Sequence, residues 1–255
     1  MQVEFRGLTL VADATGKTNL TEQAIANVTA PSSEEWQRTF QAALIREEEV
    51  AGLKILDVGG GASDFTARLL ELGADAYAID PKYARMSLLK EHVRKNNSYY
   101  NTELLAVDFK TLNKALERFK QSSMTHRDRY KAAFASAIPF PDNTFDIVFS
   151  QFAILGYLNV DISVLQAAAE ECLRVTKPSG TVRLFPFKEK QLKWDEAVNA
   201  LRMKNDHRLL EHFQQRADVE SVTTQVSRSK GNTLVIQKRS AAESDTILTT
   251  PAPLA

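Results

Sequence analysis

The chain is poor in the residues that crosslink or anchor a protein. It has one cysteine among 255 residues, which excludes an internal disulfide and a cysteine-based metal cluster. No apolar run approaches the roughly 18 residues of a membrane span. Residues 1–20 also lack a basic region followed by a long apolar stretch. We therefore expect a cytoplasmic protein with no membrane anchor and no resident metal.

The chain also lacks a net charge. Lys plus Arg number 32, and Asp plus Glu number 32, so no global field attracts nucleic acid or a basic partner. One local excess remains, since residues 82–131 hold twelve basic and five acidic residues. This stretch could attract RNA or an acidic protein. The interpretation we favour is that it forms the solvated outer faces of helices.

From residue 54 onward, short apolar runs alternate with amphipathic segments of helical length. Near-continuous apolar strands separated by helices are typical of a parallel sheet covered on both faces. Strands are predicted at 54–58, 76–80, 130–135, 145–150 and 181–187, helices at 62–72, 82–96, 111–122 and 160–175, and 103–109 is left open as a further strand.

The two ends of the chain differ from this repeating centre. Residues 1–50 include a stretch with helical period and are predicted to form an N-terminal helical cap. Near the other end, polar and apolar residues alternate on both sides of Lys230-Gly231-Asn232, the pattern of an antiparallel hairpin. We predict an α/β, doubly wound domain over 51–240, with a mostly parallel seven-stranded sheet and an antiparallel C-terminal hairpin. Residues 241–255 are expected to be a flexible tail.

The strongest chemical signal is the segment 54–83, KILDVGGGASDFTARLLELGADAYAIDPKY. A buried strand carries Asp57 near its end, and a turn of three glycines leads into a helix. Glycine permits positive φ and has no Cβ, so a ligand can lie directly against the backbone. About twenty residues further on, a second strand ends at Asp80, where a carboxylate can accept the hydroxyls of a ribose.

Two classes of nucleotide-like ligand share this geometry. A dinucleotide fold directs its G-x-G-x-x-G loop and a helix N-terminus at a pyrophosphate. Here Asp64 holds the position of the third glycine and would place a negative charge near that phosphate. Asp57 suits a cationic ligand, because a carboxylate can hold an ammonium group. S-adenosylmethionine has an amino group, a sulfonium and a ribose but no phosphate, so the pattern favours it over NAD.

The sequence resembles the class I S-adenosylmethionine-dependent methyltransferases, whose domain is Rossmann-like, over residues 54–187. LDVGGGAS is similar to their first motif, and ASAIPFPDNTFDIVFSQFAI to the segment that passes the adenine into the fourth strand. LRVTKPSGTVRLF is similar to the turn that opens the fifth strand. Two positions depart from the family pattern. Phe134 stands where many relatives have an Asp, and Ser63 stands at their third glycine.

By matched position, the resemblance implies a cofactor site at four strand ends. The first would bind the methionine part, the second the ribose and one adenine face, the third the adenine edge, and the fourth would line the methyl-transfer mouth. In that order, the implied residues are Asp57, Gly59, Gly60 and Gly61; Asp80 and Pro81; Ala135 and Ser136; and Ser150, Gln151 and Phe152. Tyr157, just after the fourth strand, is a candidate contact to the substrate.

The implied activity is methyl transfer to a small-molecule acceptor, with S-adenosylhomocysteine as product. This is an in-line displacement in which charge disappears, so alignment contributes much and a base is needed only for a poor nucleophile. No catalytic base is assigned. Residues 150–153 read SQFA, where enzymes that methylate amino groups of nucleic acids and proteins carry an NPPY-type tetrad. RNA or protein methylation, and a domain that binds cofactor or a partner without turnover, are the alternatives.

Overall fold

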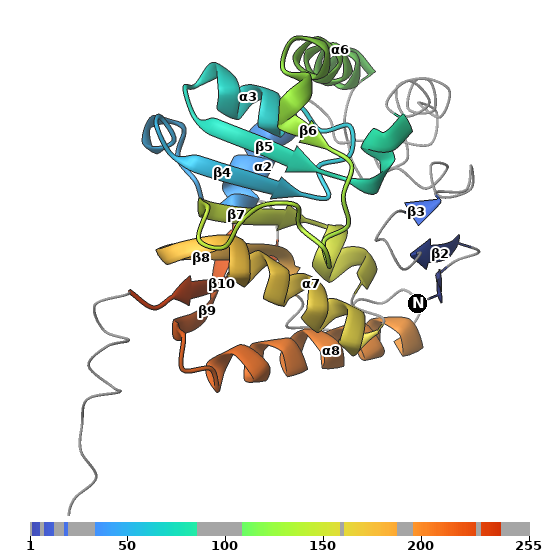
Figure 1. The fold of residues 1–255 in the computed structure, drawn as a ribbon, viewed down its shortest axis with the longest axis vertical. Helices are drawn as coiled ribbons and strands as arrows, with labels where there is room; N and C mark the ends of the chain where they lie inside the picture. The colour runs from blue at the N-terminus through green and yellow to red at the C-terminus, as the bar shows by residue number, and fades with distance from the viewer. Residues whose placement is uncertain are drawn as a thin grey trace, which may run out of the picture.

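The computed structural model describes residues 2–5, 8–12, 18–19, 34–85, 109–158, 161–187, 196–227 and 231–240. A seven-stranded sheet with the order β6-β5-β4-β7-β8-β10-β9 runs through its centre (Figure 1). The strands are β4 (Lys54–Val58), β5 (Asp75–Ile79), β6 (Tyr130–Lys131), β7 (Phe145–Gln151), β8 (Thr176–Phe187), β9 (Val219–Ser227) and β10 (Gly231–Lys238).

Pairing in this sheet is parallel from β6 to β8. Strand β10 pairs antiparallel with both β8 and β9. The predicted doubly wound, mostly parallel seven-stranded sheet with an antiparallel C-terminal hairpin is therefore confirmed.

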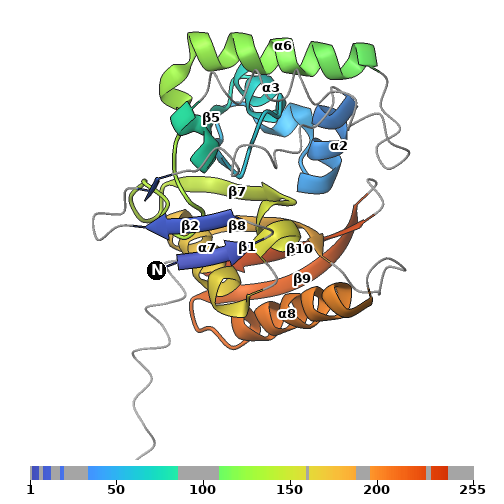
Figure 2. The ribbon, with the colours of Figure 1, turned by 90° about the vertical axis from the view of Figure 1, so that its right-hand side faces the viewer.

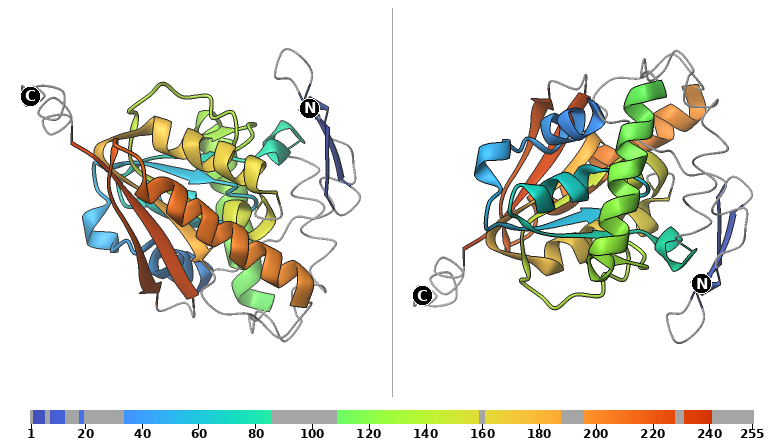
Figure 3. Two further views of the ribbon diagram at one scale, coloured as in Figure 1. Left: turned by 90° about the horizontal axis from the view of Figure 1, so that it is seen from below. Right: turned by 90° about the horizontal axis from the view of Figure 1, so that it is seen from above.

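Helices cover both faces of the sheet, as Figures 2 and 3 show. One side carries α2 (Glu34–Ala43), α3 (Phe65–Glu71) and α6 (Phe109–Thr125); the other carries α7 (Ile162–Val175) and α8 (Glu196–Gln214). Each side encloses its own hydrophobic cluster. Among the described residues, no helix is both long and apolar enough to cross a membrane.

Asp146 aligns the beginnings of three parallel strands. Its Oδ2 accepts a hydrogen bond of 2.8 Å from the Lys54 amide at the start of β4. Its Oδ1 accepts one of 2.8 Å from Lys177 Nζ on β8. These bonds fix the beginnings of β4, β7 and β8 relative to one another, and the parallel pairing places their carboxyl ends at one common edge.

Several elements differ from those expected. Strand β6 has two residues rather than six, because the chain turns away from the sheet after Lys131. Helix α8 was not predicted: among its described side chains, those of residues 200–214, Leu209 and Phe213 are the fully buried apolar ones, and charged residues surround them. Residues 86–96 of a predicted helix, 103–108 of the open strand and the tail 241–255 lie outside the described residues.

The N-terminal segment contains strands as well as a helix. β1 (Gln2–Phe5), β2 (Leu8–Ala12) and β3 (Thr18–Asn19) form a separate antiparallel sheet. It lies on the side toward which the parallel strands point (Figures 1 and 2). The helical part expected for residues 1–50 is α2, followed by the single turn η1 (Glu47–Glu49).

Phe65, at the start of α3, should be a main stabilising contact of its side of the sheet. Its ring is fully buried and packs edge-on against Phe40 of α2 and Phe149 of β7, at centroid distances of 5.1 and 5.6 Å. We expect Phe65→Ala to lower the free energy of unfolding by about 3 to 5 kcal/mol. The exposed Met124→Ala on α6 should change it by less than about 0.5 kcal/mol. Urea titration measures both, and equal losses would contradict this packing.

Candidate functional site

The glycine loop after β4 is folded against the end of β5. The amides of Gly59 and Gly60 both donate to the Ile79 carbonyl, at 2.8 and 3.3 Å. The Gly61 amide donates to Asp80 Oδ2 at 3.1 Å. Gly59 and Gly61 have φ of +78° and +52°, which glycine adopts without the strain caused by a Cβ. The structure therefore brings together the predicted loop and the predicted ribose-binding acid.

Two buried carboxylates flank this loop. Asp57 and Asp80 are only 4% and 6% exposed. Asp57 Oδ2 accepts a hydrogen bond of 3.2 Å from Thr66 Oγ1, and Asp80 Oδ1 accepts one of 2.8 Å from the Lys82 amide. Burial, opposed by the Thr66 hydrogen bond and aided by the nearby charge of Asp80, raises the pKa of Asp57 to about 7. Burial also raises the pKa of Asp80, although Lys82 opposes the shift. A bound cation would stabilise both carboxylates in their charged form.

A third carboxylate, Asp64, lies at the beginning of α3 and is fully buried. Its Oδ2 accepts a hydrogen bond of 2.9 Å from Arg118 Nη1 on α6. Its Oδ1 has no hydrogen-bond partner in the part of the chain that the structure describes. Burial raises the pKa of Asp64 to about 7 against the effect of Arg118. Three acids thus gather around the loop, an environment that disfavours a phosphate.

The amides of the loop are also occupied. Besides those of Gly59, Gly60 and Gly61, the Ser63 amide donates to the Gly60 carbonyl at 3.0 Å. A pyrophosphate is held by loop amides that point at the ligand. Because these four bond to acceptors within the protein, they do not point at a ligand as the loop amides of a dinucleotide site do.

The end of β7 forms the other side of the site. A Cβ built on Gly59 would lie 2.1 Å from Ala153 Cβ, so the loop directly touches the π-helix η4 (Ala153–Leu158). Ser150 Oγ accepts from the Ile154 amide at 3.3 Å, and Gln151 Oε1 accepts from Thr39 Oγ1 of α2 at 2.7 Å. Ser150 and Gln151, both predicted to contact the cofactor, thus connect β7 to η4 and to α2.

Phe152 is exposed at the end of β7. It is 44% exposed and has φ of +61°, a strained value for a bulky residue. Its amide donates to the Phe185 carbonyl at 2.7 Å, and its ring meets the Phe185 ring edge-on. Strained residues of this kind concentrate at functional sites, which supports the predicted place of Phe152 at the mouth.

The remaining predicted residues lie at the same edge of the sheet. Pro81 begins the 3-10 helix η2 (Pro81–Arg85). Ala135 and Ser136 lie in the turn after β6, which closes with a hydrogen bond of 3.0 Å from the Ala137 amide to the Phe134 carbonyl. Their contacts with a cofactor stay predictions. Tyr157 belongs to η4, and its side chain lies outside the described part of the structure.

Three residues that contact this site were not singled out from the sequence. Thr66 binds Asp57, Ala153 touches Gly59, and Tyr83 lies against Gly60. Thr66 and Tyr83 are close in sequence to the loop and to Asp80, so local spacing offered a signal. Ala153 is nearly a hundred positions from Gly59, and only the pairing of β4 with β7 brings the two together.

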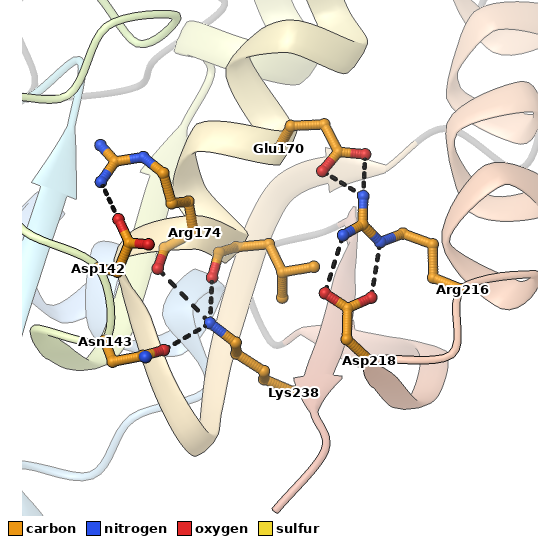
Figure 4. A pocket seen from close by; sticks show the side chains of 8 residues that line it. Asp142, Asn143, Glu170, Arg174, Arg216, Asp218 and Lys238 are labelled. Atoms are coloured by element: carbon orange, nitrogen blue, oxygen red, sulfur yellow. Dashed lines mark hydrogen bonds and ion pairs between the residues drawn. The ribbon is translucent and has the colours of Figure 1, made fainter. Parts of the chain in front are cut away.

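A separate cavity of about 230 Å³ lies near the beginning of β7 (Figure 4). Its charged side chains already have partners. Arg216 pairs with Glu170 and Asp218, and Lys238 Nζ donates to the Leu173 and Thr176 carbonyls at 3.0 and 2.8 Å. This cluster ties the end of α7 to β10, and we assign it a structural role. Within the described residues, no group of three or more His, Cys, Asp or Glu could hold a metal ion.

Taken together, the doubly wound sheet, the glycine loop and the acids at two adjacent strand ends define a Rossmann-like domain of the methyltransferase type. The profile of the ubiE/COQ5 methyltransferase family matches residues 31–203. The chain belongs to this family, and the resemblance to class I S-adenosylmethionine-dependent methyltransferases is confirmed.

The relatives include two proteins named ubiquinone/menaquinone biosynthesis C-methyltransferase UbiE. That of Shewanella pealeana is 27% identical over 157 residues, covering 61% of this chain and 50% of its own. That of Shewanella woodyi is 28% identical over 153 residues, covering 60% and 48%. The chain thus spans about half the length of these relatives.

Solved structures with a similar course include a SAM-dependent methyltransferase from Aquifex aeolicus, with TM-score 0.43 and 17% identity over 82% of this chain and 99% of that one. Magnesium protoporphyrin IX methyltransferase from Synechocystis, with bound SAM, has TM-score 0.43 and 11% identity over 81% and 80%. The strand order alone carries the fold assignment.

The contact between Gly59 and Ala153 predicts a specific loss of stability. Gly52 has nearly the same φ, +79°, but no heavy atom within 4 Å of an added Cβ. Gly52→Ala should therefore report the backbone strain alone, about 1 to 2 kcal/mol. Gly59→Ala should cost at least about 1 kcal/mol more, because its Cβ collides with Ala153. Chemical unfolding of the two variants measures the difference; equal losses would show that the loop and η4 do not touch.

Proposed function

We propose that the protein transfers a methyl group from S-adenosylmethionine to a small-molecule acceptor, with S-adenosylhomocysteine as product. The observation that carries this proposal is the pair of buried carboxylates, Asp57 and Asp80, on either side of a glycine loop whose amides are occupied. Such a site suits a ligand with an ammonium group and a ribose but no phosphate. Family membership supports the same donor.

The residues present fit this cofactor. Asp57 would hold the ammonium group and Asp80 the ribose hydroxyls, while the glycines let the ligand approach the backbone. When bound, S-adenosylmethionine supplies a methyl group on a positively charged sulfur. Phe152, at the end of β7, would line the mouth of the site. The protein's part is to fix the ends of the ligand so that an acceptor meets the methyl group in line.

For the acceptor we propose a small aromatic molecule, because the relatives from Shewanella are named for ubiquinone and menaquinone biosynthesis. RNA is a weaker candidate. Several described basic residues of the stretch 82–131 are paired with acids: Arg118 with Asp64, Lys120 with Glu117, and Arg129 with Asp75.

We place the reaction in the cytoplasm, since the free, buried Cys172 fits a reducing compartment.

Parallel calorimetric titrations test the cofactor. We expect S-adenosylmethionine and S-adenosylhomocysteine to bind and NAD not to bind. Asp80→Ala should weaken binding of both adenosyl ligands by about 1 to 3 kcal/mol, because it removes the acceptor of the ribose hydroxyls. Asp142→Ala, in the cavity near the beginning of β7, is the matched control and should leave the affinity unchanged. Binding of NAD alone would overturn the proposal.

Acceptor class is tested with radiolabelled S-adenosylmethionine and a panel of short-chain benzoquinols, naphthoquinols, bulk RNA and bulk protein. Incorporation into a quinol is the expected result. Incorporation into RNA or protein alone would overturn the proposed acceptor but not the cofactor.

The pKa of Asp57 predicts how affinity for S-adenosylhomocysteine depends on pH. Below about 7 this carboxyl is protonated in the free protein, and it must lose its proton to hold an ammonium group. Affinity should therefore fall about tenfold from pH 8 to pH 6. Asp57→Asn should bind more weakly and lose this part of the slope. The amine of the ligand and the remaining carboxylate, Asp80, contribute equally to the pH dependence of the wild-type protein and of the variant. Identical slopes of affinity against pH in the two proteins would therefore contradict the role of Asp57.

A further inference from the structure

Tyr83 is a buried residue at the site for which the proposed reaction gives no role. It lies in η2, and its amide donates to the Asp80 carbonyl at 3.1 Å. The side chain is 8% exposed. A tyrosine hydroxyl that is buried normally has a polar partner, so the surroundings of this hydroxyl decide what it does.

The ring of Tyr83 is fixed by two other aromatic residues. It stacks on Phe119 of α6 with centroids 6.3 Å apart and meets Tyr130 of β6 edge-on at 5.6 Å. Phe119 and Tyr130 also meet edge-on, at 5.7 Å. Contacts from two separate elements leave the ring little freedom, so the direction of its hydroxyl is set by the fold.

That hydroxyl is directed at the glycine loop. A Cβ built on Gly60 would lie 2.9 Å from Tyr83 Oη and 2.8 Å from Asp57 Oδ2. The phenol and the carboxylate therefore face the same side of Gly60, and the absence of a side chain there leaves both oxygens room. Tyr130, the other tyrosine of the cluster, instead donates its hydroxyl to Ser122 Oγ of α6 at 2.8 Å.

The chemistry of the two groups is complementary. Burial raises the pKa of Tyr83 well above its usual value, and the charges of Asp80 and Asp57 raise it further. The phenol therefore keeps its proton and can donate it in a hydrogen bond. A phenol that donates to a neighbouring buried carboxylate favours its ionised form, which is the form of Asp57 that an ammonium group requires.

We propose that Tyr83 is a positioning residue of the cofactor site, whose hydroxyl holds the Asp57 carboxylate that receives the ammonium group of S-adenosylmethionine. This inference rests on the proposed function. It assigns Tyr83 a role in recognition of the amino-acid end of the ligand, and none in recognition of the adenosine end.

Two ligands separate these ends. S-adenosylhomocysteine carries the amino acid, whereas 5′-methylthioadenosine has the adenosine and the sulfur but no amino acid. Calorimetry should show that Tyr83→Phe lowers the affinity for S-adenosylhomocysteine about tenfold, the loss expected for one hydrogen bond to a charged group. The affinity for 5′-methylthioadenosine should stay within about twofold. Tyr130→Phe, in the same aromatic cluster, should leave both affinities unchanged.

A double-mutant cycle tests whether Tyr83 acts through Asp57. In an Asp57→Asn background, Tyr83→Phe should not lower the affinity for S-adenosylhomocysteine any further. Gly60→Ala is a second variant, since its Cβ would displace both oxygens while Tyr83 and Asp57 keep their own chemical groups. It should reduce affinity for S-adenosylhomocysteine more than for 5′-methylthioadenosine.

The outcomes distinguish this inference from the proposed function. If wild-type protein binds neither S-adenosylmethionine nor S-adenosylhomocysteine, the proposed function fails and Tyr83 loses its role with it. If wild-type protein binds but Tyr83→Phe has no effect, or weakens both probe ligands equally, the inference alone is overturned.

Discussion

The register of β4 against β5 is the constraint on which the site depends. Asp57 lies opposite Ala78, and Val58 opposite Ile79, so both strands end at the same level. The chain leaving β4 must turn over the end of β5, where the Ile79 carbonyl captures two of its amides. A shift of one residue would turn Asp57 to the other face of the sheet. Loop, acids and Tyr83 would then no longer meet.

Burial makes this arrangement chemically useful and also costly. A carboxylate taken out of water loses hydration, which hydrogen bonds replace only in part. Thr66 compensates Asp57, the Gly61 and Lys82 amides compensate Asp80, and Arg118 compensates Asp64. The compensation is incomplete for all three carboxylates, since the pKa of each is raised. Under the proposed function, a positively charged ligand would complete this compensation, because the carboxylates are incompletely neutralised without one.

The sequence predicted those parts of the fold whose signal is local. Apolar runs located β4, β5 and β7, and glycines after a strand located the loop. The length of β6 and the existence of α8 were not predicted: the first is decided by where the chain leaves the sheet, and the second by a narrow contact of Leu209 and Phe213. At the site, Asp57 and Asp80 were predictable from spacing. The contact between Ala153 and Gly59 was not predictable from spacing, because it forms only when β4 and β7, which are distant in sequence, pair.

The insertion of β10 between β8 and β9 bears on how the domain is assembled during synthesis. Until residues 231–238 leave the ribosome, β8 has an open edge, and the places of Leu234 and Ile236 in the core are empty. An unpaired edge beside exposed apolar surface is prone to aggregation. The part of the chain that carries the glycine loop and the acids is therefore synthesised before the sheet can close, and during that interval its open edge is exposed.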